Sequence, residues 1–184
     1  DFRLREGFTD EMTKVLVGRM RETVEFAHGA GAVLADANEL NWLARVKGPE
    51  SPSPSVIDVD SWAIGKFGAS VIMPSIRDWH RSGFDRLTDW FAWGVVTFQL
   101  WTGIHPYKGR LDGFGPGDME ARMKANKSVF TKGIHLNRAV RDIRVIPAPL
   151  CAWYEATFQH GERTVPPSPF ETGVVTPRAA LTLH

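Results

Sequence analysis

The chain has 184 residues, of which 43% are hydrophobic and 23% charged, so it is long enough for one domain with a hydrophobic core. Its 22 Lys and Arg nearly balance 21 Asp and Glu, and the net charge of +1 gives no reason to expect nucleic acid or an anionic membrane as a partner. The one cysteine, Cys151, excludes an intrachain disulfide and a cysteine-based metal site, and it favours a cytoplasmic protein.

The first predicted element is an amphipathic helix. Apolar residues recur at steps of three and four positions from Met12 to Ala27, which is the spacing of one helix face. Thr9 is suited to cap the start of this helix, and Gly29 and Gly31 indicate its end. We therefore expect one face of the helix to pack against the core.

A β-hairpin is predicted next. Residues 42–46 have the composition of a strand, residues 47–55 form a turn rich in Pro and Ser, and residues 55–57 lead back as a second strand. The polar run 36–41 precedes the first arm, and Asp58 follows the second. Because a hairpin brings the open ends of its arms together, we expect these polar residues to meet at one edge.

The most apolar segment of the chain predicts a buried helix. Thr88 or Asp89 is expected to cap it, and it extends from Trp90 to Trp101 with apolar residues nearly all round. It is too short to span a bilayer, so no membrane partner is expected. The segment 61–84 before it has no clean period and is expected to be irregular. Two further helices are predicted over residues 118–127 and 150–158.

The polar residues at the ends of the hairpin are candidates for a metal site. Magnesium prefers hard oxygen ligands, usually one or two carboxylates together with phosphate oxygens. Asn41 and Asp58 are therefore candidates to share one ion, with Asp36 beside them as a base or an orienting group. The alternative is that these are three ordinary polar loop residues, because a D-x4-N spacing also arises by chance.

The order of these segments resembles the C-terminal lobe of protein kinases. Residues 35–41 (ADANELN) resemble the catalytic loop H-R-D-L-x-x-x-N, and residues 56–60 (VIDVD) resemble the strand that leads into D-F-G. Residues 88–96 (TDWFAWGVV) resemble the start of the central buried helix of that lobe. Residues 103–109 (GIHPYKG) resemble the G-x-x-P-F-x-G that follows it, and residues 161–166 (GERTVP) an arginine-containing segment near the end.

The resemblance spans roughly residues 9–168. More specifically, the chain is similar to a divergent group of bacterial and phage kinase-like proteins. It implies a mainly α (α+β) fold, namely a kinase-like C-lobe with a short hairpin at the catalytic edge and a central buried helix. Residues 1–170 would form this lobe and residues 171–184 a C-terminal tail.

The resemblance also implies a role for each matching residue. Asp36 would be the catalytic residue that accepts or orients the proton of the attacking hydroxyl. Asn41 and Asp58 would hold Mg²⁺ and thereby bind ATP. Asp89 would support the catalytic loop through backbone hydrogen bonds, with a plain helix N-cap as the alternative. Arg163 would form a buried ion pair with a partner that the sequence does not identify.

Several positions depart from the kinase pattern. Leu34 and Ala35 replace the His and Arg of the catalytic loop, and Asn38 stands where protein kinases usually keep a Lys that contacts the transferred phosphate. Asp60 replaces the Gly of D-F-G, as an extra ligand or, the favoured interpretation, a turn residue. The nearest match to A-P-E, residues 73–75 (MPS), lacks the Glu.

The sequence leaves two functions open. No Gly-rich loop and no V-A-I-K strand precede the first helix, so an N-lobe is expected in the same or another chain, and this chain alone is expected to be inactive. The first function is Mg-ATP-dependent phosphoryl transfer to a hydroxyl, of Ser or Thr on a protein substrate. The second is that of a pseudokinase or structural interaction module with a protein partner. Retention of Asp36, Asn41 and Asp58 favours the first, and Asn38 favours the second.

Two smaller features complete the candidates. The basic and aromatic residues from Arg77 to Arg86 predict a phosphate or partner site or, as favoured, a solvated loop, because clusters of this size are usually exposed. His105, which precedes Pro106, is expected to be structural or exposed rather than a ligand, because the histidines show no paired metal spacing.

Overall fold

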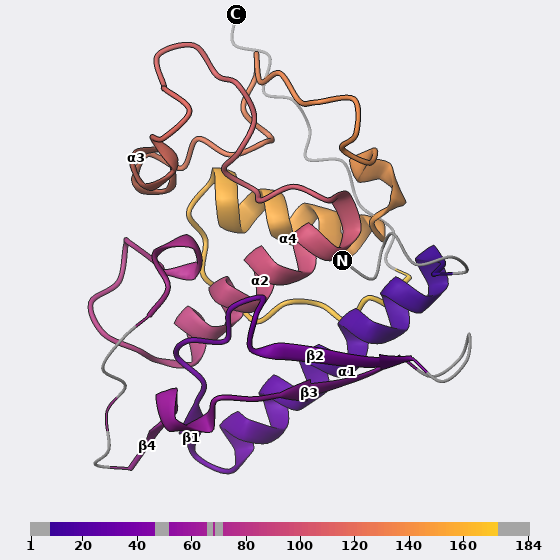
Figure 1. Cartoon of the computed structure of the whole chain (residues 1–184), viewed down its shortest axis with the longest axis vertical. Helices are drawn as coiled ribbons and strands as arrows, with labels where there is room; N and C mark the ends of the chain where they lie inside the picture. Colours follow the sequence, from indigo (N-terminus) through magenta and orange to yellow (C-terminus); the bar gives the residue numbers. More distant parts are fainter. Residues whose placement is uncertain (1–7, 47–51, 66–67, 69–71, 173–184) are drawn as a thin grey trace, which may run out of the picture.

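One apolar helix, α2 (Arg86–Thr102), runs through the middle of the molecule, as Figure 1 shows. The computed structural model describes residues 8–46, 52–65, 68 and 72–172. Over these residues the chain is a small mixed α/β domain with four α-helices and two antiparallel two-stranded sheets. Besides α2, its helices and strands are α1 (Asp10–Gly29), β1 (Ala32–Val33), β2 (Trp42–Val46), β3 (Pro52–Val56), β4 (Ala63–Ile64), α3 (Met119–Lys124) and α4 (Ala148–Gln159). None of the helices in this described part is long and apolar enough to cross a membrane.

The predicted first helix is confirmed. The hydroxyl oxygen of Thr9 accepts a hydrogen bond from the backbone N–H of Met12 at 3.2 Å, which caps the first turn of α1. Asp10 and Glu11 lie in that turn, where the helix dipole favours negative charge. The buried face of α1 packs against α2 and the hairpin, so the predicted amphipathic face is the core face.

The start of α2 differs from the prediction. The helix begins at Arg86, and the residue that caps it is Asp85 rather than Thr88 or Asp89. The Asp85 carboxylate accepts hydrogen bonds from the backbone N–H groups of Leu87 and Thr88, and the Thr88 hydroxyl accepts one from the Asp85 N–H. Asp85 is a common N-cap residue, but Thr88 replaces the usual Glu or Gln at the third helical position, so the sequence signature of this box is weak.

The predicted burial of α2 is confirmed for residues 90–98 and for Trp101, whereas Gln99 and Leu100 are only partly buried. Trp93 and Phe98 have no exposed surface, and both contact Tyr154 of α4, which is itself fully buried. Gly94 allows this close packing, because a Cβ there would lie 3.0 Å from the ring of Trp153. Interlocked aromatic rings from α2 and α4 thus form the centre of the core.

The hairpin is longer than predicted. The strand β3 begins at Pro52, inside the segment expected to be a turn, and it pairs with β2 so that Trp42 faces Val56 and Val46 faces Pro52. Proline is tolerated here because each strand of a two-stranded ribbon is an edge strand, whose outward N–H groups need no partner in the sheet. The remaining residues of the predicted turn, 47–51, lie outside the described residues.

The later helices are confirmed with different bounds. The helix α3 covers only part of the predicted 118–127, because Asn126 adopts a left-handed conformation with φ 52° that ends the helical path. The helix α4 contains the predicted 150–158. The described residues of the segment 61–84 are irregular apart from β4, the end of a 3₁₀ turn at Ser61 and a second 3₁₀ turn over Pro74–Ile76. Most of the predicted tail, residues 173–184, lies outside the described residues, and its boundary at residue 170 stays a prediction.

Candidate functional site

Backbone pairing brings the polar segments of the predicted site to one edge of the domain. The strands β1 and β4 pair antiparallel, so Val33 lies opposite Ala63. The hairpin ladder continues beyond β2 and β3, because the N–H of Ile57 donates to the carbonyl of Asn41 at 2.9 Å. The pairing of β1 with β4 and the bond between Ile57 and Asn41 therefore hold the loop that contains Asp36 beside the segment that contains Asp58.

The loop between β1 and β2 is fixed by its own hydrogen bonds. The side-chain N–H of Asn41 donates to the backbone carbonyl of Asp36 at 2.8 Å. The amide oxygen of Asn38, which is 4% exposed, accepts from the N–H of Leu40. The Asp36 carboxylate is half-buried, and its Oδ1 accepts a hydrogen bond from the N–H of Met73 at 2.8 Å. Asp36 thus joins the loop to the segment that precedes α2, a contact that the sequence did not predict.

The end of the hairpin presents two exposed carboxylates. Asp58 has a left-handed backbone with φ 60° and ψ 50°, a conformation that is uncommon for residues other than glycine. Its carbonyl accepts hydrogen bonds from the hydroxyl and the N–H of Ser61, which closes a 3₁₀ turn, and Asp60 lies within that turn. This geometry agrees with the turn interpretation of Asp60. An uncommon backbone conformation at a polar residue next to a loop is typical of functional sites.

Asn41 and Asp58 carry the kinds of oxygen that magnesium takes when it also binds phosphate, an amide oxygen and a carboxylate. Because Asn41 uses its side-chain N–H to bind the Asp36 carbonyl, its amide oxygen is left as a potential ligand. Asp58 adds one exposed carboxylate. Within the described ranges no group of three or more His, Cys, Asp or Glu is arranged to hold a metal. Two protein ligands are the number with which magnesium is usually held when waters and phosphate oxygens complete its coordination.

Asp89 makes the backbone hydrogen bonds that the resemblance implied. It lies in the first turn of α2 with 1% of its surface exposed, and its two oxygens accept from the N–H groups of Leu34 and Ala35, each at 2.8 Å. A third bond, also 2.8 Å, comes from Nε2 of His28 at the end of α1. Ala35 has φ 57°, a strained value for alanine, and the Asp89 carboxylate holds this conformation. The alternative of a helix N-cap is wrong, because Asp85 fills that position.

Arg163 forms the expected buried ion pair, and its partner is Asp78. The guanidinium donates through Nε and Nη2 to both oxygens of Asp78, whose side chain has no exposed surface. A further N–H donates to the carbonyl of Thr157, and the guanidinium lies over the ring of Phe91. The sequence missed Asp78 because the acid follows the MPS segment by three positions instead of completing an A-P-E motif.

The basic cluster and His105 are engaged within the protein. Arg77 and Lys124 both lie over the ring of Trp79, at 4.5 Å, and Arg81 pairs with Asp85. These contacts agree better with a structural role than with a phosphate site. His105 is buried; its Nδ1 accepts from the N–H of Tyr107 and its Nε2 donates to the carbonyl of Ser75, so it is structural as expected.

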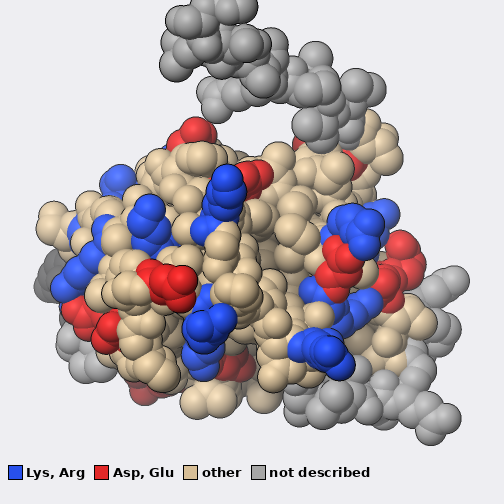
Figure 2. All heavy atoms as spheres, turned by 90° about the horizontal axis from the view of Figure 1, so that it is seen from above, with Lys and Arg blue, Asp and Glu red and all other residues tan. Residues whose placement is uncertain are grey.

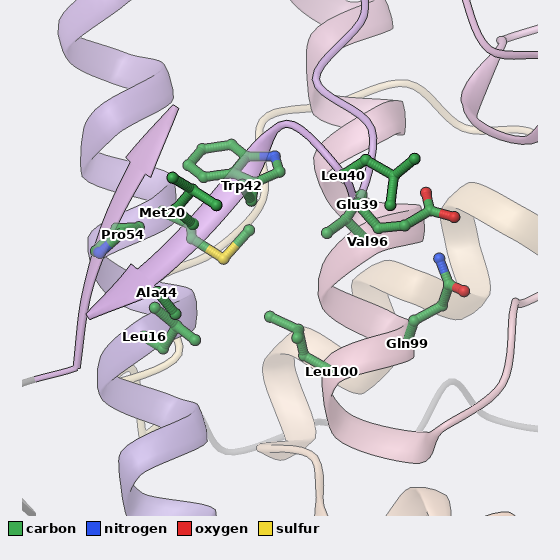
Figure 3. A pocket seen from close by; sticks show the side chains of 11 residues that line it. Leu16, Met20, Glu39, Leu40, Trp42, Ala44, Pro54, Val96, Gln99 and Leu100 are labelled. Atoms are coloured by element: carbon green, nitrogen blue, oxygen red, sulfur yellow. The ribbon is translucent and has the colours of Figure 1, made fainter. Parts of the chain in front are cut away.

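An apolar cavity of about 340 Å³ lies beside the loop, between α1, the hairpin and α2. Figure 3 shows Met20 and Trp42 across the cavity from Val96 and Leu100, with Glu39 and Leu40 near its mouth. No sequence pattern predicts this cavity, because its walls come from segments that are distant along the chain.

Several exposed apolar side chains lie on the hairpin and on the segments next to it in the chain. Leu40 and Leu43 are 69% and 53% exposed, and the stretch that follows the hairpin adds three more. Those three are Ile57, Val59 and Ile64. Exposed apolar residues that are grouped in this way usually mark a surface that another molecule or segment covers.

Comparison of the chain with protein-family models and with curated proteins gives no match. Support for a function therefore comes from the motifs and from the geometry of this edge.

Proposed function

We propose that this chain is the C-terminal lobe of a kinase-like protein that transfers a phosphoryl group from Mg-ATP to a hydroxyl, most simply of Ser or Thr on a protein. The observation that carries the proposal is the anchoring of the loop 34–41 by Asp89. A buried carboxylate that holds a strained loop through two backbone N–H groups is a costly arrangement, and it positions Asp36 and Asn41 next to the end of the hairpin.

In this proposal Asp36 orients the attacking hydroxyl. Its Oδ1 is bound to the N–H of Met73, and its Oδ2 makes no hydrogen bond with the described residues. Oδ2 is therefore the atom that would accept a hydrogen bond from a substrate hydroxyl. Because Oδ1 is fixed, the direction of this acceptor is set before substrate binds, which is the usual contribution of a positioning carboxylate.

Asn41 and Asp58 would hold the magnesium ion through one amide oxygen and one carboxylate. Such an ion would supply positive charge beside the nucleotide phosphates. Asn38 supplies no positive charge for the transferred phosphate, so the transition state would depend on a donor from elsewhere. That donor and the rest of the nucleotide cleft would come from an N-lobe, in the same or another chain.

The exposed apolar residues support such a second half. Leu40, Leu43 and Ile57 lie on the segments that carry Asn41 and Asp58, where a nucleotide and an N-lobe would cover them. The chain alone would then bind nucleotide weakly and catalyse little or nothing.

A pseudokinase or interaction module is the second candidate. The observation that favours it is that Asn38 is buried and used to fix the loop, so the position has no side chain for the phosphate. In this case Asp36 would serve the structure through its contact with Met73.

The test is a titration of ATP and magnesium against the wild type and Asp58→Asn, followed by the ³¹P resonances of ATP and by amide shifts of the protein. Asp60→Asn is the matched control, because it removes a neighbouring exposed carboxylate. We expect magnesium-dependent nucleotide binding in the wild type and in Asp60→Asn, with affinity at least about tenfold weaker in Asp58→Asn, as expected for a lost metal ligand. Absence of magnesium-dependent binding in all three proteins would contradict the enzymatic proposal for this chain. Equal binding by all three would remove Asp58 from the site.

A further inference from the structure

A second cavity, of about 880 Å³, lies between α3 and the loops on either side of it. Figure 1 shows α3 at the opposite end of the molecule from β1 and β4, so this cavity is separate from the candidate magnesium edge. Its walls include apolar residues such as Tyr107, Leu111 and Met119, and the glycine-rich stretch 113–115.

Arg122 is a buried cation in the wall of this cavity. It is 3% exposed, and it donates from Nε to the carbonyl of Lys127 at 2.9 Å and from Nη1 to the carbonyl of Gly109 at 2.7 Å. Its third nitrogen, Nη2, is buried without a hydrogen-bond partner among the described residues. An unsatisfied donor on a charged group is costly to bury, and carbonyl oxygens do not neutralise the charge.

The charges that line the cavity leave Arg122 uncompensated. Lys108 and Arg110 add two exposed cations, and the one acid among the described lining residues is Asp112. The side chain of Asp112 is 94% exposed and lies 3.8 Å from Arg110, so it faces the solvent rather than Arg122. Burial lowers the pKa of Arg122. The pKa of His105 is lowered to about 4 by burial first and also by the charges of Lys108 and Arg122.

This excess of positive charge belongs to the cavity and not to the whole face. Figure 2 views the molecule from the end that bears α3 in Figure 1, and basic and acidic side chains are interspersed over it. A general attraction for anions is therefore not expected, whereas a local one is.

We propose that this cavity is an oxyanion-binding site in which Arg122, Lys108 and Arg110 bind a phosphate or carboxylate group. Because Nε and Nη1 of Arg122 already donate to backbone carbonyls, Nη2 is the nitrogen that would donate to such a group. The apolar part of the wall is suited to an oxyanion carried on a partly apolar molecule. The site contains none of the residues assigned to phosphoryl transfer, so a test of this proposal does not depend on that function.

The first experiment is a titration of the ¹⁵N-labelled 184-residue chain with sodium phosphate and, separately, with sodium malonate, at an ionic strength held constant with NaCl. We expect saturable shifts at the amides of Gly109, Gly113 and Gly115, which line the cavity. The anion that binds more tightly identifies the class, a phosphate or a carboxylate ligand. Shifts that do not saturate, or that occur equally over the surface, would overturn the proposal; this is also the result expected if water alone satisfies Nη2.

The second experiment compares variants. Lys108→Ala with Arg110→Ala removes two exposed charges from the cavity, and Lys132→Ala with Arg138→Ala removes two exposed charges outside its lining. We expect the dissociation constant to rise about fivefold in the first double variant and to stay unchanged in the second, since each exposed charge contact contributes roughly 0.5 kcal/mol and two are lost, about 1 kcal/mol in total. Arg122→Met should abolish saturable binding if it folds. Equal weakening by both pairs would show non-specific charge attraction and overturn the site.

Discussion

At the scale of single residues, burial decides the chemical state of His105. The imidazole is 4% exposed, accepts at Nδ1 and donates at Nε2, so it uses both nitrogens in the neutral form. Burial lowers its pKa from 6.5 to about 4, and the nearby charges of Lys108 and Arg122 contribute. Protonation would remove the acceptor for the N–H of Tyr107 and place a further charge in a positive region.

This gives a pH dependence with a defined sign. Between pH 6.5 and 4 the unfolded chain binds a proton at His105 and the folded chain does not, so the free energy of unfolding falls as the pH is lowered through that window. The loss in the free energy of unfolding amounts to roughly 3 kcal/mol below pH 4, and above pH 6.5 there is no loss. Urea unfolding at several pH values measures it. The variant His105→Gln, which keeps a donor for the carbonyl of Ser75, should show a flatter curve in this window; an identical slope would refute the assignment.

Partner choice at this scale could not be predicted from the sequence. His28 and Asp89 are 61 residues apart in the sequence, and only the folding of the chain brings them into hydrogen-bond contact. The same holds for Asp36 and Met73, which are separated by 37 positions. The motifs singled out Asp36 and Asp89, because a D-x4-N spacing and the start of an apolar helix are local patterns. The groups that bind them are determined by tertiary packing, which local periodicity does not predict.

At the scale of elements, α2 positions the loop 34–41 through Asp89. Replacing this residue by Asn leaves one acceptor oxygen for two backbone N–H groups and the ring of His28, and turns an N–H group toward another donor. We expect Asp89→Asn to lower the free energy of unfolding by about 2–3 kcal/mol, as for an unsatisfied buried donor. Urea unfolding measures this change, with the exposed Asp60→Asn as the control expected to stay within about 0.5 kcal/mol of wild type.

The readout that separates positioning from stability is local. The amides of residues 34–41 should exchange with solvent faster in Asp89→Asn, while those in the middle of α2 should lose protection only as far as global stability falls. Uniform loss of protection would mean that Asp89 stabilises the whole domain without a special role in the loop.

The elements themselves were largely predictable, and the errors have physical causes. The periodicity of α1 and the apolar surface of α2 are strong signals, because they extend over many residues. The capping box was missed because Thr88 stands where Glu or Gln usually does, and the strand β3 was missed because proline rarely occurs within a strand. The antiparallel pair β1 and β4 was missed because each strand has two residues, too few for a pattern.

At the scale of the whole molecule, the ion pair of Asp78 and Arg163 links the segment before α2 to the segment after α4. The two residues are 85 positions apart, and their side chains are 0% and 9% exposed. The sequence predicted a buried pair for Arg163 without its partner, because the acid does not stand in the expected motif. Such a pair contributes little over a well-packed apolar substitute, but breaking it leaves an unpaired buried charge.

A double-mutant cycle tests this arrangement. Arg163→Met and Asp78→Asn should each lower the free energy of unfolding by about 3–5 kcal/mol, because each leaves the other group buried without its partner. The double variant should cost at least about 2 kcal/mol less than the sum, because neither charge then remains. Urea unfolding of the four proteins measures the coupling. Additive single effects would show that the two side chains act separately. A loss below about 1 kcal/mol for Arg163→Met would show that the bond of Arg163 to the carbonyl of Thr157 and its contact with Phe91 are also dispensable for stability.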